Sequence, residues 1–278
     1  MRNIFILLFT LCFVMCAPRQ SDNTISVDLD HPEKASLFDY FSSIELIPLE
    51  TSSDALVQAL TKVVEHDDKY YALDKPQCLI FVFDKAGKFL YKIGTKGQGA
   101  GEYAFISDFN INPFSGNLEI LEPYGRIHVY SLLGDFIETK RISYPEFKVA
   151  HSLAALDNDI YVSHSLFEPK KIAYFDLNKQ ELLHEEFEED MAIGSYSQIP
   201  YQYKDEWFFY RPFHPIVYKI GKKQLEASFK FDFGKYTKDG RTAVLSQEAK
   251  MNFTKNIEEM YAQYSYMIEA VRHNAKYL

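Results

Sequence analysis

The chain has 278 residues, of which 47% are hydrophobic and 25% charged, so it is long and apolar enough for one globular domain with a sizeable core. Its formal net charge of −9 argues against a nucleic-acid partner, because phosphate binding requires a basic face and the Lys and Arg residues are scattered along the chain. The same charge disfavours adsorption to an anionic membrane through electrostatics alone.

The first sixteen residues have the pattern of an export signal. Arg2 supplies a positive charge, residues 4–15 form an apolar run, and Cys16 is followed by the polar residues 17–23. The apolar run is shorter than the roughly 20 residues that a membrane-spanning helix needs. We therefore expect residues 1–16 to act in export and not in the fold.

This segment resembles a bacterial lipoprotein signal, in which the cysteine is acylated and becomes the mature N-terminus. The resemblance implies a lipid on Cys16 and a location in the cell envelope, as an outer-membrane lipoprotein held to the membrane by that lipid only. Met15 departs from the small residue that such signals prefer before the cysteine. A signal that is retained or cleaved elsewhere is the alternative. Residues 17–43 are predicted to form a polar tether.

Four stretches of the chain repeat at a spacing of about 45 residues. The matched positions Phe83, Tyr130, Phe175 and Lys219 are 47, 45 and 44 residues apart. Each unit combines short apolar and aromatic runs with a Gly or Asn turn, which is typical of antiparallel strands. The pattern predicts an all-β chain, a β-propeller of four-stranded antiparallel blades within a domain at 44–278. The predicted blades are 56–96, 102–144, 147–190 and 196–234.

Blades must stack on one another, because a single four-stranded sheet cannot cover both of its faces. The 23 Phe and 20 Tyr residues suit such stacking. Ahead of the first blade, residues 44–50 are predicted to form an isolated strand that pairs with the last blade and removes an exposed sheet edge.

After the last blade the pattern changes to helical spacing. Apolar residues recur at steps of three and four, and Ser246 is a candidate N-cap, so a helix is predicted at about 246–272. The apolar stripe, which we expect to pack against the propeller, consists of Ile257, Tyr261, Tyr264, Ile268 and Val271.

The glycine-rich segment 94–103 does not match a phosphate-binding loop, and its glycines are predicted to supply positive φ angles between blades. Together with residues 83–93 it is similar to the signature of NHL-type propellers. With residues 47–51 upstream, it resembles the six-bladed β-propeller lipoproteins of Bacteroides-type bacteria, over about residues 44–234. That resemblance implies six blades where four are recognisable. A truncated chain is the favoured interpretation, and a smaller or incomplete ring is the alternative.

The loops between the second and third strands of each blade open on one face, around the central channel. They place Lys, Arg, His and Tyr side chains at one mouth, a surface suited to ligand binding. The candidate ligand-face residues are Lys75, Tyr124, Arg126, His164, Arg211 and His214. We predict a non-enzymatic module that binds a carbohydrate, a peptide or another envelope protein, with no cofactor and no metal.

The alternative is an enzyme, a propeller lyase or hydrolase that acts on a polysaccharide or a small ester with a metal in the channel. His128, His164 and His214 fall at similar places in successive blades, which makes a channel metal conceivable. The eight histidines lack the spacing of zinc-binding motifs, and no nucleophile elbow is present. The sequence therefore predicts no catalytic residue. Cys78 is left alone after the signal and is predicted to be a structural, partly buried thiol.

Overall fold

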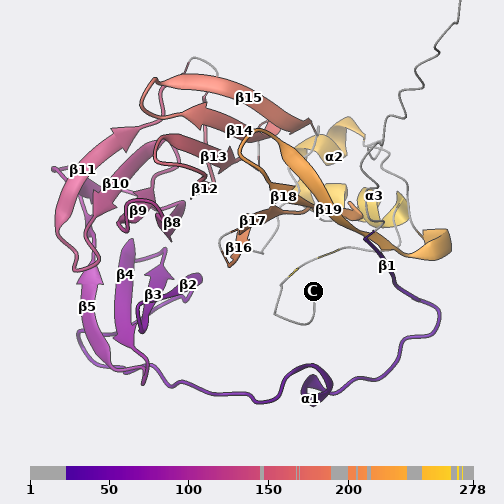
Figure 1. Cartoon of the computed structure of the whole chain (residues 1–278), viewed down its shortest axis with the longest axis horizontal. Helices are drawn as coiled ribbons and strands as arrows, with labels where there is room; N and C mark the ends of the chain where they lie inside the picture. The colour runs from indigo at the N-terminus through magenta and orange to yellow at the C-terminus, as the bar shows by residue number, and fades with distance from the viewer. Residues whose placement is uncertain are drawn as a thin grey trace, which may run out of the picture.

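The structure is a computed structural model that describes residues 23–144, 147–166, 168, 170–188, 200–204, 206–211, 214–236, 246–263, 268 and 271. Its strands form four antiparallel sheets arranged around a central channel (Figure 1). The chain is thus a four-bladed β-propeller with a few short helices, which confirms the predicted fold class.

Each blade is a meander in which the first strand lies innermost and the fourth outermost. The first blade consists of β2 (Lys62–His66), β3 (Lys69–Asp74), β4 (Leu79–Asp84) and β5 (Phe89–Ile93). The second consists of β8 (Asp108–Ile111), β9 (Leu118–Leu121), β10 (Arg126–Tyr130) and β11 (Phe136–Arg141). The third consists of β12 (Ser152–Ala155), β13 (Ile160–His164), β14 (Lys170–Asp176) and β15 (Glu181–Glu188). The fourth consists of β16 (Tyr201–Tyr203), β17 (Glu206–Phe209), β18 (Ile216–Ile220) and β19 (Leu225–Asp232).

The core lies between neighbouring blades, as the aromatic content predicts. One buried cluster joins the first blade to the second through residues such as Val82 and Ile120. A second cluster joins the second and third blades, and a third joins the third and fourth, where Tyr174 and Phe209 are both fully buried. The middle strands of each blade contribute most of these side chains because both of their faces are covered.

The strand that pairs with the last blade is not the predicted one. Residues 44–50 form no strand; Glu50 instead donates its backbone N–H to the carbonyl of Gly87 at 2.8 Å, and its carboxylate accepts from the N–H of Phe89. β1 (Thr24–Ser26), inside the predicted tether, pairs in parallel with β19. The last residue of the predicted strand thus bonds to a turn of the first blade, and the shorter β1 covers the outer edge of the fourth blade.

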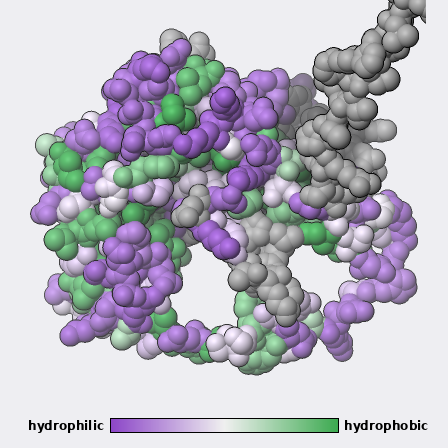
Figure 2. All heavy atoms as spheres, in the orientation of Figure 1, coloured by the Kyte–Doolittle hydropathy of each residue, from purple (hydrophilic) through white to green (hydrophobic). Residues whose placement is uncertain are grey.

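Residues 27–61 run from β1 to β2 across the open side of the ring (Figure 1). They include α1 (Leu37–Tyr40), whose N-terminus is closed by a capping box between Ser36 and Asp39. None of the α1 residues is buried. Figure 2 shows that this face of the molecule is hollowed between the first blade and residues 27–61.

Shorter elements complete the fold. β6 (Thr95–Lys96) and β7 (Glu102–Tyr103) pair within the glycine-rich segment, where Gly94 and Gly101 have the predicted positive φ. The 3₁₀ helix η1 (Gly234–Tyr236) follows β19.

The predicted C-terminal helix begins at the expected residue but is divided. The structure contains α2 (Gln247–Met251) and α3 (Phe253–Gln263), and Ser246 caps α2 by accepting a hydrogen bond from the N–H of Ala249. Farther along, Val271 is buried in the core between the third and fourth blades, and Ile268 packs against that core. Across the described parts of the chain, no helix is long and apolar enough to cross a membrane.

Candidate functional site: the central channel

A cavity of about 590 Å³ opens in the channel between the first, second and fourth blades. Its wall is formed by β2, by the end of β8 and by β16, with Trp207 of β17 at its side. The volume falls in the range of small-ligand sites. The lining residues that offer hydrogen-bonding or charged groups are Lys62, Glu65, His66, Asn110, Tyr201, Gln202, Lys204 and Trp207.

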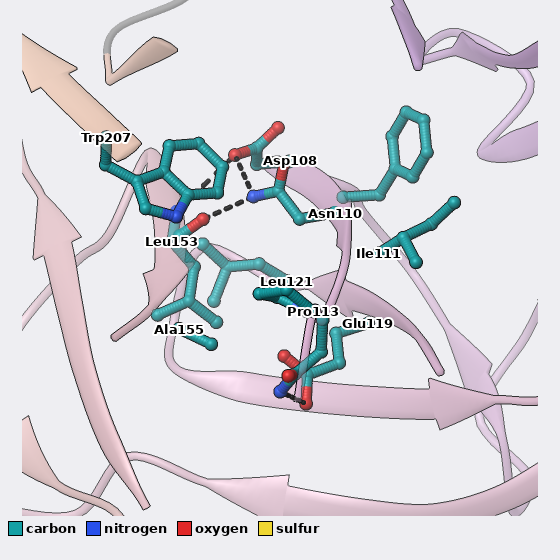
Figure 3. Close-up of a pocket in the computed structure, with 11 residues that line it drawn as sticks. Asp108, Asn110, Ile111, Pro113, Glu119, Leu121, Leu153, Ala155 and Trp207 are labelled. Carbon is teal, nitrogen blue, oxygen red and sulfur yellow. Dashed lines mark hydrogen bonds between the residues drawn. The ribbon is translucent and has the colours of Figure 1, made fainter. Parts of the chain in front are cut away.

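A polar network joins the inner strands of the first three blades at one end of this cavity. The ammonium group of Lys62 lies 2.7 Å from the carboxylate of Asp108, 2.7 Å from the backbone carbonyl of Phe109 and 2.7 Å from the side-chain oxygen of Asn110. Asn110 in turn donates to the carbonyl of Leu153 on β12 (Figure 3). Hydrogen bonds thereby connect Lys62 on β2, through the side chain of Asn110 on β8, to the backbone of the third blade.

This network is enclosed by the fold. Only 11% of the Lys62 side chain and 9% of the Asp108 side chain are exposed. Two charges so far from water are stable only when their hydrogen-bonding groups are satisfied, which the surrounding oxygens and amides achieve. Lys62 and Asp108 are 46 residues apart, close to the repeat length, so they occupy equivalent places at the starts of neighbouring inner strands. The prediction from sequence missed this pair.

Trp207 lines both the large cavity and a smaller one of about 10 Å³, which has room for about one water molecule. Figure 3 shows its indole ring beside Leu153 and above Ala155. Asp108 and Asn110 lie to the right of the ring in this view. The Trp207 side chain is buried, so it forms part of the channel wall and not a projecting surface.

A group of basic residues lies at the mouth of the channel near this network. Burial, together with the positive charges of Lys75 and Lys171, lowers the pKa of His151 to about 4. His151 accepts a 3.1 Å hydrogen bond from the N–H of Leu166, and Lys171 donates to the carbonyl of the same residue at 2.9 Å. Lys75 belongs to the same neighbourhood. Partial desolvation lowers the pKa of its ammonium group, and the negative charge of Asp108 opposes that shift. The mouth therefore places the ammonium groups of Lys75 and Lys171 beside an imidazole that is neutral near pH 7, on a chain of net negative charge.

The candidate residues of the first two blades lie at different depths. Lys75 follows β3 and is exposed beside the channel mouth. Tyr124, in the loop between β9 and β10, is 70% exposed. Arg126 begins β10, and its guanidinium donates to the buried carboxylate of Glu122. None of these three lines the large cavity.

The candidate residues of the last two blades do not line the large cavity either, and their two histidines lie close together. His164 is 3% exposed and its ring lies 5.7 Å from that of Phe209. Phe187 lies 5.0 Å from Phe209 and 5.1 Å from His214, so the two histidines share one aromatic cluster between the blades. Arg211 follows β17 and is fully buried. A ligand role for any of the six candidate residues stays a prediction.

Two further predictions concern metal and lipid. Among the residues that the structure describes, no three His, Cys, Asp or Glu side chains are grouped so that they could hold a metal ion. Cys16 and the rest of the export signal lie outside the described residues. Cys78 is a buried free thiol whose sulfur donates to the carbonyl of Ala104 at 3.4 Å.

The fold and channel define the class of this protein, a β-propeller with its candidate site between the inner strands. The chain belongs to the family described as a domain of unknown function, DUF4934, whose model matches residues 22–278. The comparison with curated proteins gives no match.

The chain is also similar in fold to solved structures. One is a protein from Bacteroides fragilis NCTC 9343 described as exported, with a TM-score of 0.62 and 18% sequence identity over 76% of this chain and 60% of that one. Another is a member of the DUF4221 family from Bacteroides vulgatus ATCC 8482, with a TM-score of 0.45 and 15% identity over 69% of this chain and 62% of that one. The chain thus spans less than two thirds of the length of either protein.

Proposed function

We propose that this protein is an exported, lipid-anchored β-propeller that binds a polar ligand in its central channel and does not transform it. The observation that carries the proposal is the cavity of about 590 Å³ whose wall combines the inner strands of three blades. Sites of this size that collect side chains from several rigid elements are the usual places where folded domains bind ligands.

The wall chemistry favours a ligand rich in hydroxyl or amide groups. Gln202 and Lys204 are exposed on the fourth blade, and Glu65 and His66 belong to the wall that β2 of the first blade forms, so donors and acceptors reach the cavity from different blades. The Trp207 side chain adds an apolar surface beside them. Such a mixture suits an oligosaccharide or an extended peptide segment, free or displayed by another envelope protein.

Export and anchoring are supported by different observations. Residues 1–16 have the charge and apolar pattern of a signal, with Cys16 at the expected acylation position. The similar protein from Bacteroides fragilis is itself described as exported. We therefore propose that the chain is a lipoprotein of the outer membrane.

The binding proposal is tested with a panel of polysaccharides and peptides, by thermal shift followed by equilibrium titration of each hit. Gln202→Ala and Lys204→Ala both change exposed residues of the cavity wall, so the fold should tolerate them. We expect either variant to weaken binding by about tenfold. Lys223→Ala, an exposed residue outside the wall, is the matched control and should leave affinity unchanged. Equal affinity in all variants, or chemical turnover of a hit, would contradict the proposal.

A further inference from the structure

We infer that β1 sets the orientation of the anchored propeller, so that the channel mouth beside Lys75 points away from the membrane, toward a ligand in the aqueous compartment. This inference rests on the proposed acylation of Cys16. It uses the direction of one short strand, the hydrogen bonds that hold it and the length of chain before it.

The two faces of the propeller follow from the strand order. In every blade the loop between the second and third strands, such as that between β3 and β4, lies at the face where the fourth strand ends. We call this the mouth face; it carries Lys75 and Tyr124. The turns between the first and second and between the third and fourth strands lie at the opposite face, which we call the turn face. Leu133, between β10 and β11, belongs to the turn face.

The pairing of β1 fixes the direction in which the chain enters the fold. β19 is a fourth strand, so its last residue, Asp232, lies at the mouth face. β1 is parallel to β19, with Thr24 opposite Lys230 and Ser26 opposite Asp232. The chain therefore runs along the outer edge of the fourth blade toward the mouth face, and enters β1 from the side of the turn face.

Contacts on both sides of β1 hold this segment to the blade. The N–H of Lys230 donates to the carbonyl of Asn23 at 3.0 Å, and the N–H of Val27 donates to the carbonyl of Asp232 at 2.8 Å. The side chain of Asn23 donates to the carbonyl of Ser228 at 3.0 Å. Beyond β1, the ammonium group of Lys235 lies 2.6 Å from the carboxylate of Asp30. Backbone and side-chain bonds together make β1 a fixed point on the fourth blade.

The anchor cannot lie far from this point. Only six residues lie between Cys16 and Asn23, so seven Cα–Cα steps connect the two. Fully extended, they span about 25 Å. Because β1 points its N-terminal end toward the turn face, an extended course from Asn23 would carry an acyl chain at Cys16 past the turn-face edge of the fourth blade, and would leave the mouth face as the outward surface.

The test compares two sites on one blade, so that both are at a similar distance from the anchored edge. Tyr124 on the mouth face and Leu133 on the turn face are 70% and 73% exposed, which makes them a matched pair. Each is replaced by Cys in the Cys78→Ser full-length chain, expressed in a host that acylates lipoproteins, and labelled with a donor dye. The protein is inserted into phosphatidylethanolamine–phosphatidylglycerol vesicles with an acceptor-labelled lipid, and energy transfer is measured.

We expect transfer from position 133 to exceed transfer from position 124 by about twofold, because the tether is short. Ile25→Pro removes an N–H from β1 and should abolish the difference without releasing the protein from the vesicles. Equal transfer from the two sites, or more from 124, in protein that floats with the vesicles overturns the inference and leaves the proposed anchoring intact. Full-length protein that does not float, behaving like Cys16→Ser, overturns both.

Discussion

The hydroxyl group of Tyr161 on β13 donates a 2.8 Å hydrogen bond to the carboxylate of Glu119 on β9, and so connects the third blade to the second. The side-chain amide of Asn112 donates to both groups, at 2.9 Å to the tyrosine oxygen and 3.0 Å to the carboxylate. All three residues are buried. The contact is a satisfied polar network inside an otherwise aromatic interface.

Loss of that hydroxyl should cost stability. We expect Tyr161→Phe to lower the free energy of unfolding by about 1–3 kcal/mol, because Glu119 and Asn112 each lose a buried partner. Tyr103→Phe is the matched control: its hydroxyl is also buried but has no hydrogen-bond partner among the described residues, so its removal should be neutral or slightly stabilising. Urea denaturation measures both. A similar loss in the two variants would show that the network contributes nothing.

The ion pair in the channel gives a second prediction. Lys62→Met leaves the carboxylate of Asp108 enclosed without its cation, and should lower the free energy of unfolding by about 3 kcal/mol. Lys85→Met removes an ion pair to Glu65 whose side chains are 44% and 58% exposed, and should cost less than about 1 kcal/mol. Equal losses would contradict the role given to the channel network.

Gly94 offers a test of the segment between the first two blades. Its φ is +94°, and a Cβ added there would overlap the hydroxyl oxygen of the fully buried Tyr103. We expect Gly94→Ala to cost about 3 kcal/mol, through overpacking and backbone strain combined. Gly116→Ala, with φ +70° and nothing within 4 Å of the added Cβ, isolates the backbone cost of about 1 kcal/mol. Thermal unfolding of both variants gives the comparison. Equal losses of stability would mean that the Tyr103 side chain moves aside without energetic cost.

His151 gives a prediction about pH. Its pKa of about 4 in the folded chain lies below the ordinary value of 6.5, so the unfolded chain binds more protons between these two values. The free energy of unfolding should therefore fall as the pH is lowered from about 6.5 to 4, by at most about 3 kcal/mol from this group.

Denaturant titrations at pH 7, 6, 5 and 4 measure this dependence. His151→Gln should give a shallower slope than the wild type over that window, since it removes the titrating imidazole. Identical slopes for the variant and the wild type would contradict the prediction.

The sequence predicted the blades well because each unit carries its own signal. Runs such as residues 79–84 are apolar on both faces, and turn residues mark their ends, so strand number and repeat length can be inferred locally. β1 carried no such signal: it has three residues in a polar context, and its pairing with β19 is made by backbone groups. Residues 44–50 have the stronger pattern, but Glu50 at their end bonds to the turn at Gly87 and not to the last blade.

The site was harder to predict because it depends on which strand is innermost. His164 and His214 were predicted to lie at the channel mouth. The structure places His164 beside Phe209 and His214 beside Phe187, in one aromatic cluster, and neither lines the large cavity. Lys62 and Asp108 look like ordinary charged residues in short strands. Their separation of 46 residues, nearly one repeat, is the signal that could have identified them.

Trp207 is the single tryptophan of the chain, and it stands in the wall shared by the two channel cavities. Its intrinsic fluorescence therefore comes from one known place, beside the proposed ligand. Any molecule that enters the channel and displaces water near the indole should shift or quench this emission, so occupancy can be followed in the unlabelled wild-type protein.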